Sequence, residues 1–581
     1  MTIDQAANSF SFINDFKLHT ELVQFGDNAL PLYASALYLD IDDFASFASN
    51  SLTDDPADKK ADIIYISEAD SLAYVAQGYS AQQWGQPTAP ANKASDLNTA
   101  AAWLLQADIN TVPPVIKSQA QMLRKCLTDQ SISRIIFAYA HNACISPTVK
   151  AELDTLQTMV GGLSLCQGVT IETVELGLQS IQELYLNSTG IIQVTEEIDL
   201  ESDGVIKVPG NNWDSFVLTL NGEVLRKLYE THKSALFSAN LRDFLGLRKN
   251  ARNVNNTIRD TAQQRPDEFF ILNNGVTLIT NDAKLLDNPR RLRVSGLSVV
   301  NGAQTTGSLF AAGALHASQV SLLARVIRVS DDTLIGKIVA GNNTQNSIVA
   351  WDRRSNDSLQ IRIKGEFVAK GISYVHRRDS NRHSSSSSIF AEQIGQMLCA
   401  FGGDLQTAIR AKAEIFESDA TYAKVFPNSI TIEHMYAVQT LGWAYDEVKS
   451  ALRVKLSSNS ATQIERAEFQ LIDFPASKQF VLATFSHLRE EIAGRSIPHV
   501  STFRFRQDKV ISNHRPATTA WASALSFLLP LMASNLPAPP YEVVRSTAHL
   551  ATVATQVRGL TAGLLAVQNP FVMIRTFLAN P

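Results

Sequence analysis

Apolar and polar residues follow two different spacings along the first 190 residues, which predicts both helices and strands there. Short runs rich in β-branched and aromatic residues, typical of strands, cover 62–67, 71–77 and 132–139. Apolar residues at helical spacing predict helices over 12–25 and 96–107. The order helix, strand, strand, helix, strand favours a small α/β domain built on a mixed sheet.

The remainder of the chain divides by the same patterns into two regions. Residues 191–240 have the pattern of strands that lead into a helix, and 241–380 that of further α/β structure. From Ile389 onward the spacing is mainly helical, with a proline-rich break at 537–540. We therefore predict an α/β chain of three domains, over residues 1–190, 191–388 and 389–581, of which the last is mainly helical.

Composition narrows the class of protein. The chain has 581 residues, of which 45% are apolar and 18% charged, as in globular proteins. Its most apolar stretch, 518–535, is interrupted by Pro530 and is shorter than the roughly 20 residues of a membrane span. The four cysteines form no CxxC pair, and the first residues lack a signal-peptide pattern. We expect a cytoplasmic protein without a membrane segment, a disulfide framework or a zinc finger.

Charge is distributed unevenly. Residues 1–70 carry 13 acidic and three basic side chains, whereas the whole chain has a net charge of only −5. Basic residues gather over 242–265 and 353–383. Such patches can neutralise the phosphates of a nucleic acid, although a solvated helix face has the same composition.

Asp62 and Gln77 form the first pattern with a chemical interpretation. Asp62 opens one predicted strand and Gln77 ends the next. An acid in the first position and an acid or glutamine in the second can hold Mg²⁺ or Mn²⁺, which polarises a phosphate, while a lysine two residues later orients the attacking water. This arrangement resembles the PD-(D/E)xK nucleases of the Mrr type, and the resemblance implies a restriction-endonuclease-like N-terminal domain.

One position departs from that nuclease pattern. Tyr79 stands where the lysine is expected, and tyrosine carries no positive charge at neutral pH. Lys93, just before the next predicted helix, is a candidate replacement. We predict Asp62, Gln77 and Lys93 as catalytic residues, with Asp62 as a metal ligand. The alternative is an inactive domain that has been retained for structure or binding.

A second pattern, rich in asparagine, covers residues 240–378. Each of its pieces has a structural explanation: Asn274-Gly275 between FFIL and VTLIT indicates a hairpin, and Asn301-Gly302 a turn after a strand. Together they place amides, hydroxyls and a predicted helix N-terminus near the basic stretches, which suits an anion or a nucleotide. The predicted binding residues are Arg242, Asn273, Asn274, Gly275, Asn301, Gly302, Gln304, Thr305, Thr306, Asn343, Gln345, Asn346, Arg377 and Arg378.

The order of these pieces resembles a known family. NLRDFLG, VNNTI, FFILNNGVTLI, VVNGAQTTGSL, NNTQNSI and HRR occur in this order over about residues 225–425, and the run is similar to the AIPR family, the abortive-infection phage-resistance proteins of bacteria. The resemblance implies a role in antiphage defence. A weaker resemblance of the strand, NGAQTT and helix to the ParB and sulfiredoxin-like fold implies nucleotide binding, although the basic residues of that fold are absent here.

Three hypotheses follow. The first is a divalent-metal nuclease, activated by phage, that acts on DNA or RNA. The second is a sensor that binds nucleic acid or a nucleotide through residues 240–380 and has an inactive nuclease-like domain. The third is a protein-interaction role of the acidic first 70 residues, with a phage-derived protein as the trigger. We also expect a homo-oligomer.

Overall fold

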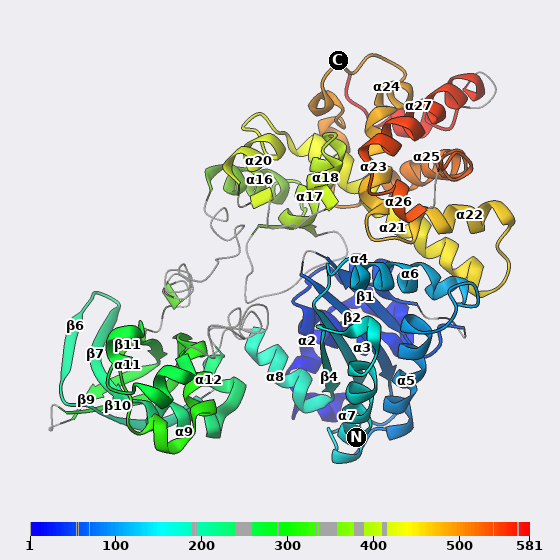
Figure 1. Ribbon diagram of the computed structural model, residues 1–581. Coiled ribbons are helices and arrows are strands. Elements are labelled where there is room, and N and C mark those ends of the chain that lie inside the picture. The colour runs from blue at the N-terminus through cyan, green and yellow to red at the C-terminus, as the bar shows by residue number, and fades with distance from the viewer. Residues whose placement is uncertain are drawn as a thin grey trace. The chain divides into compact units, whose positions relative to one another are not determined.

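The computed structural model divides the chain into two compact units, one formed by Met1–Ser180 with Val349–Pro581 and the other by Ile181–Ile348 (Figure 1). The sequence predicts three domains, with boundaries at residues 190 and 388. The structure instead joins the N-terminal and C-terminal parts of the chain in one unit. The structure describes all residues except 1, 54, 56, 69, 189–191, 193, 239–257, 287–289, 330, 332–333, 336–337, 339–356, 377–387, 410–414, 417, 538–539, 566–568 and 581.

The N-terminal part of the first unit is built on a four-stranded sheet in the order β1-β2-β3-β4. The strands are β1 (Ile63–Ser67), β2 (Leu72–Tyr79), β3 (Arg134–His141) and β4 (Thr170–Leu176). β1 is antiparallel to β2, whereas β2, β3 and β4 are parallel, so the sheet is mixed as predicted. Nearly every residue of β3 is buried, as expected of a parallel strand covered on both faces.

Helices surround this sheet. Before β1 come α1 (Ile3–Ala7), α2 (Phe12–Leu18), the 3-10 segment η1 (Thr20–Asn28), α3 (Ala29–Leu39) and α4 (Phe44–Ser51). The parallel crossovers contain α5 (Ala91–Leu105), α6 (Pro114–Thr128), α7 (Pro147–Gly161) and the 3-10 turn η2 (Ser164–Cys166), and α8 (Leu178–Ser188) follows β4. The helix predicted over 12–25 ends earlier, because the backbone leaves the helical region at His19, whose ring bonds to Glu21.

The second unit contains a seven-stranded sheet. Its path is β5 (Val194–Glu201), β10 (Arg291–Asn301), β8 (Val276–Thr280), β11 (Ser321–Val329), β7 (Trp213–Asn221) and β6 (Val205–Pro209), with β9 (Asp282–Leu285) beside β10. Its helical segments include α9 (Gly222–His232), η3 (Lys233–Phe237), α11 (Phe269–Leu272), α12 (Ala303–Ala312) and α13 (Ala314–Ala317), and residues 258–264 are also helical. The buried side chains of α9 and α12 belong to the same apolar core as the sheet.

The hairpin predicted at Asn274-Gly275 does not form. The segment before it, Phe269–Leu272, is the short helix α11, and β8 pairs in parallel with β11 and antiparallel with β10. Gly275 still needs its special backbone, since its φ is +75° and a Cβ there would lie 2.2 Å from the Leu323 carbonyl oxygen. The turn residues are therefore required by a close approach to β11 and not by a hairpin.

The C-terminal part of the first unit is mainly helical, as predicted. Its helices are α16 (Ser358–Val368), α17 (Ala391–Phe401), α18 (Leu405–Ile409), α20 (Asp419–Val425), α21 (Ile432–Ser457), α22 (Gln463–Ile472), α23 (Ser477–His487), α24 (Arg489–Ala493), α25 (Arg515–Ser534), α26 (Pro540–Val543), α27 (Thr547–Leu564) and α28 (Val572–Arg575). The strands β12 (Tyr374–Val375) and β13 (Ile389–Phe390) and the 3-10 turns η4 (Val500–Thr502) and η5 (Gln507–Lys509) complete it.

By length and composition alone, α25 (Arg515–Ser534) would pass as a membrane span among the described residues. About half of its most apolar window is buried in the protein, and Trp521, Leu525 and Leu528 belong to the helical core. A core helix has the same composition, so this helix is weak evidence for a membrane. All four cysteines are free.

Polar contacts join the two parts of the first unit. Asp473, after α22, accepts hydrogen bonds from Ser118 and Gln119 of α6 and pairs with Arg453 of α21. Lys449 of α21, fully buried, donates to Asn50 of α4. Because these groups lie away from water, the contact between the parts depends on their mutual pairing.

Candidate functional site

Asp62 and Gln77 lie together, as their predicted places on neighbouring strands require. Asp62 immediately precedes β1, and Gln77 lies near the end of β2. The Asp62 Oδ2 atom accepts a hydrogen bond from Gln77 Nε2 and another from the main-chain N–H of Gly78, both at 2.6 Å. Gln77 Nε2 also contacts the Gly78 carbonyl oxygen at 3.3 Å.

The surroundings of this pair are tightly packed. Gln77 is 5% exposed, and its Oε1 atom is buried with no hydrogen-bond partner in the structure. A Cβ on Gly78 would lie 2.6 Å from Pro31 of α3, so only glycine fits there. Asp58 shares a hydrogen bond with Asp62, and burial raises the pKa of the Asp58 carboxyl. A raised pKa favours the protonated form of the Asp58 carboxyl.

The pair offers a partial set of ligands for Mg²⁺ or Mn²⁺. Such ions prefer carboxylate, carbonyl and amide oxygens, which Asp62, Gly78 and the unpaired Gln77 Oε1 can supply. In the structure the Gln77 amino group occupies the space between the Asp62 and Gly78 oxygens. A bound ion would therefore require the amide to turn over. Among the described residues, no three His, Cys, Asp or Glu side chains are grouped closely enough to hold a metal ion.

Lys93, the candidate for the cationic role, lies beside an acidic side chain of its own helix. Tyr79 is paired in register with His141 of β3. Lys93, in the first turn of α5, has its Nζ atom 4.0 Å from Asp96 Oδ2, and Lys60 approaches the same carboxylate at 3.8 Å. The structure thus brings Asp62 and Gln77 together and assigns Lys93 an acidic neighbour of its own.

A buried pair marks the carboxyl ends of β3 and β4. His141 is fully buried, its Nδ1 accepts the main-chain N–H of Ala143 at 3.2 Å, and its Nε2 lies 3.1 Å from Glu175. This pattern leaves Nε2 as the protonated nitrogen, which donates to the carboxylate. Glu175 also accepts the main-chain N–H of Ser146 at 3.1 Å. Both side chains are held by hydrogen bonds within the protein, so we interpret the pair as structural.

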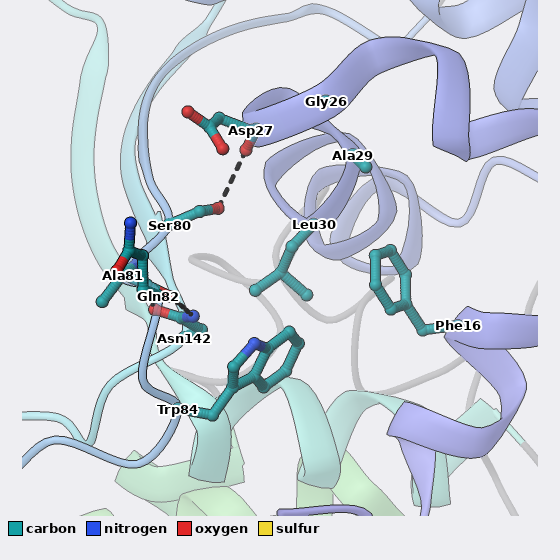
Figure 2. Close-up of a pocket in the computed structure, with 10 residues that line it drawn as sticks. All are labelled: Phe16, Gly26, Asp27, Ala29, Leu30, Ser80, Ala81, Gln82, Trp84 and Asn142. Atoms are coloured by element: carbon teal, nitrogen blue, oxygen red, sulfur yellow. Dashed lines mark hydrogen bonds between the residues drawn. The ribbon is translucent and has the colours of Figure 1, made fainter. Parts of the chain in front are cut away.

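A cavity of about 290 Å³ lies beside the end of β2, and sequence patterns do not reveal it. Figure 2 shows its walls, where the side chains of Phe16, Leu30 and Trp84 point toward one another. The full lining is Phe16, Gly26, Asp27, Ala29, Leu30, Ser80, Ala81, Gln82, Trp84 and Asn142. These residues come from segments far apart in the sequence, which explains why no local motif marks the cavity.

In the second unit, two of the asparagine-rich segments meet at the side-chain amide of Asn273. The Asn273 side chain exchanges hydrogen bonds with the Thr305 hydroxyl at 3.2 and 3.3 Å and accepts the Gly275 N–H at 3.0 Å. A Cβ on Gly302, whose φ is +101°, would lie 2.5 Å from Val276 and 3.1 Å from the Gly275 carbonyl oxygen. Two predicted binding segments are therefore in direct contact.

The predicted anion site at the following helix differs from expectation. The helix begins at Ala303, so Gln304, Thr305 and Thr306 lie within its first turns. Thr305 and Thr306 are buried, and the Thr306 hydroxyl donates to the Gly302 carbonyl. Gln304 and Asn301 are half-buried, and Asn274 is exposed. The threonine hydroxyls thus support the turn and are not presented to solvent.

Six of the predicted binding residues lie outside the described residues, and their roles stay predictions: Arg242, Asn343, Gln345, Asn346, Arg377 and Arg378. Part of each basic stretch, 242–265 and 353–383, also lies outside the described residues.

Comparison with known proteins gives one match. Residues 237–512 match the family model described as AIPR protein, which confirms the AIPR resemblance for this part of the chain. The match runs from the second unit into the helical part of the first. No curated protein and no solved structure matches the chain.

Proposed function

We propose that this protein acts in bacterial antiphage defence by abortive infection, and that it acts on nucleic acid as a divalent-metal-dependent nuclease. The match of residues 237–512 to the AIPR family supports the defence role. The observation that supports the chemistry is the contact between Asp62 and Gln77, which unites a carboxylate and an amide at the end of β2.

The proposed site would use three groups of this chain. The Asp62 carboxylate and the Gly78 carbonyl would present oxygens to Mg²⁺ or Mn²⁺, and Gln77 would add its Oε1 atom, the buried acceptor that now lacks a partner. The bound ion would polarise a phosphate and lower the pKa of a bound water. Lys93 would supply the positive charge that Tyr79 cannot, once its side chain leaves Asp96.

The experiment that tests this proposal is cleavage of labelled DNA and RNA by the purified protein with Mg²⁺ or Mn²⁺. We expect Asp62→Ala and Gln77→Ala to lower the rate at least 100-fold, in the range of losses for a group that stabilises the transition state. Asp508→Ala, an exposed acid of η5, should leave the rate unchanged. Cleavage that persists in Asp62→Ala would exclude this site.

A second candidate function is favoured by the contact of Asn273 with Thr305. In this alternative the asparagine-rich region binds nucleic acid or a nucleotide, and the N-terminal domain is catalytically inactive. Binding that is lost in Asn301→Ala or Gln304→Ala but retained in Asp62→Ala would favour it over the nuclease. A steep loss of binding with salt would indicate phosphate contacts, since counterion release makes such contacts salt-dependent.

A further inference from the structure

The face of the first sheet that carries Asp62 and Gln77 is the face covered by α5. Val75 of β2 belongs to the same apolar core as Leu97 of α5. Side chains alternate along a strand, so Gln77, two residues after Val75, points to this face as well. Asp62 accepts its hydrogen bond from Gln77 and lies on the same side. A substrate held at this pair would therefore approach α5.

Tyr139 connects the start of α5 with this pair. It is the register partner of Gln77 on the neighbouring strand β3, so the two side chains share one face of the sheet. The Tyr139 hydroxyl donates at 3.2 Å to the carbonyl of Pro90, the residue before α5. Burial is the main reason why the pKa of Tyr139 is raised, and the charge of Asp96 contributes to it. The first turns of α5 thus lie at the same end of the sheet as Gln77.

Two lysines converge on Asp96 at this end of the sheet. Lys93, in the first turn of α5, and Lys60, in the loop before β1, have their Nζ atoms 4.0 and 3.8 Å from the same Asp96 oxygen. Both distances exceed the roughly 2.7–2.9 Å of a charge-assisted hydrogen bond. Lys60 and Lys93 together form the lysine pair, which carries one positive charge more than Asp96 compensates. Each ammonium group therefore keeps donors for a further anion.

The loop before β1 fixes Lys60 relative to Asp62, which follows it by two residues. The main-chain N–H of Lys60 donates to Asp58 Oδ1 at 2.8 Å, and Asp58 shares a hydrogen bond with Asp62. The φ of Lys60 is +72°, in the left-handed region that costs energy for any residue with a Cβ. Such a backbone persists only where the surrounding structure holds it. The loop thus keeps Lys60 close to the proposed metal ligand.

The positive charge of the lysine pair stands out against its surroundings. Residues 1–70 contain 13 acidic and only three basic side chains, and Lys60 is one of these three. Its neighbour Lys59 packs over the ring of Trp103 of α5, with Nζ 4.8 Å from the ring centre. A phosphate that approached Asp62 would be repelled by the acidic residues around it, unless a local positive charge offset them. The lysine pair supplies that charge.

We propose that the lysine pair binds a phosphate group of a nucleic-acid backbone next to Asp62, and that Asp96 competes with this phosphate for the two ammonium groups. A phosphate has several oxygens that accept hydrogen bonds and can bridge two donors, whereas Asp96 meets both lysines at longer distances. Lys60 thereby gains a role that sequence patterns do not indicate. The inference rests on the proposed function, because the bound phosphate would lie beside the residues proposed for cleavage.

The test is equilibrium binding of a labelled oligonucleotide, as a single strand and as a duplex, in EDTA, which prevents cleavage. Lys60→Gln should weaken binding about five- to tenfold at about 0.1 M salt, as expected for one lost phosphate contact. The dependence of log affinity on log salt should become shallower by about 0.7 for the single strand and 0.9 for the duplex. Lys60→Arg should retain most of the affinity. Asp96→Asn should tighten binding about fivefold, the effect of removing one charge at about 4 Å in water.

The ion pair of Lys125 with Asp129 provides matched controls. Lys125 is as exposed as Lys60, and its Nζ lies 2.9 Å from Asp129. The two residues lie at the end of α6, before the start of β3, and therefore at the opposite end of the sheet from Asp62. Lys125→Gln and Asp129→Asn change the net charge as Lys60→Gln and Asp96→Asn do, and they should leave binding unchanged.

Combined substitutions separate competition by Asp96 from a general effect of charge. In a protein that carries both Lys60→Gln and Lys93→Gln, the further change Asp96→Asn should no longer tighten binding. A gain that persists in this background, unchanged binding in Lys60→Gln, or no binding of either probe by the wild type would overturn the inference.

The same measurements distinguish this inference from the nuclease proposal. Cleavage that is lost in Asp62→Ala, together with unchanged binding in Lys60→Gln, would remove the lysine pair and leave the nuclease standing. The expected binding changes in a protein that cleaves no substrate would support the lysine pair and count against the nuclease.

Discussion

At the scale of single residues, burial decides what each polar side chain can do. Asp62 and Gln77 could be paired from sequence, because each lies at the end of a predicted strand. The contact of Lys93 with Asp96 was missed because the helix begins at Ala91, before the predicted start at residue 96, and so brings the two residues together at i,i+3 spacing. The orientation of the Gln77 amide depends on the tertiary structure, because its amino group donates to Asp62 and to the Gly78 carbonyl.

His19 gives a pH prediction at this scale. It is 3% exposed and lies between Asp15 at 3.4 Å and Glu21 at 3.0 Å. Burial lowers its pKa, but the hydrogen bonds and charges of Asp15 and Glu21 outweigh burial and raise the pKa to about 9. The folded pKa is above the unfolded one, so this stabilisation is complete below about pH 6.5 and is lost as the pH rises through 9, a change of roughly 3 kcal/mol.

The variant His19→Gln should therefore lower the free energy of unfolding at pH 6 and flatten its fall between pH 6.5 and 9. Urea denaturation at a series of pH values measures both effects. His499→Gln, at an exposed position, is the matched control and should keep the wild-type pH dependence. An unchanged slope in His19→Gln would contradict the assigned pKa.

At the scale of elements, the spacing of apolar residues identified the strands β1, β2 and β3 and most of the helix α5, and it failed where a segment is short. FFIL has the composition of a strand, but Phe269–Leu272 forms one helical turn, of which only Phe269 is buried. The Asn274-Gly275 pair that follows correctly predicts a positive φ, which Gly275 adopts. Which strand the following segment pairs with depends on β11, almost 50 residues later, and no local pattern contains that information.

Two glycines of the second unit should respond to alanine with opposite signs. Gly275→Ala places a Cβ against the Leu323 carbonyl in a left-handed backbone, and we expect a loss of roughly 2–5 kcal/mol in stability. Gly307→Ala, inside α12 with no atom near the new methyl group, should gain about 0.5–1 kcal/mol. Hydrogen exchange of peptides from β8 and α12 measures both changes. Equal protection in the two variants would refute the close approach.

At the scale of the whole molecule, the C-terminal part of the chain belongs to the same compact unit as the N-terminal part. Residues 349–581 join 1–180 in one unit, whereas 181–348 form the other. The contact is carried by buried polar groups, with Asp473 at its centre. The pKa of Lys449 falls to about 8, because burial lowers it more than Asp473 raises it. Such an interface is sensitive to the loss of any one partner.

Asp473→Ala should destabilise this contact strongly. The change leaves the buried Arg453 without its counter-charge and Ser118 and Gln119 without an acceptor, so we expect a loss of about 3–5 kcal/mol. Limited proteolysis should then cut α6 or α21 sooner than in the wild type. Asp508→Ala, which removes an exposed acid paired with Arg506, should change stability by less than about 0.5 kcal/mol. Identical digestion patterns of the two variants would exclude this role of Asp473.

The sequence by itself determined the α/β class, the strands that carry Asp62 and Gln77, the helical C-terminal part and the AIPR resemblance. These features depend on apolar spacing and short motifs, which are local. The tertiary structure alone decided the parallel pairing of β8 with β11, the union of the two chain ends and the cavity lined by Phe16 and Trp84. The physical reason is that these contacts join residues far apart in the chain, and their energies depend on a packing that exists only once the whole domain has folded.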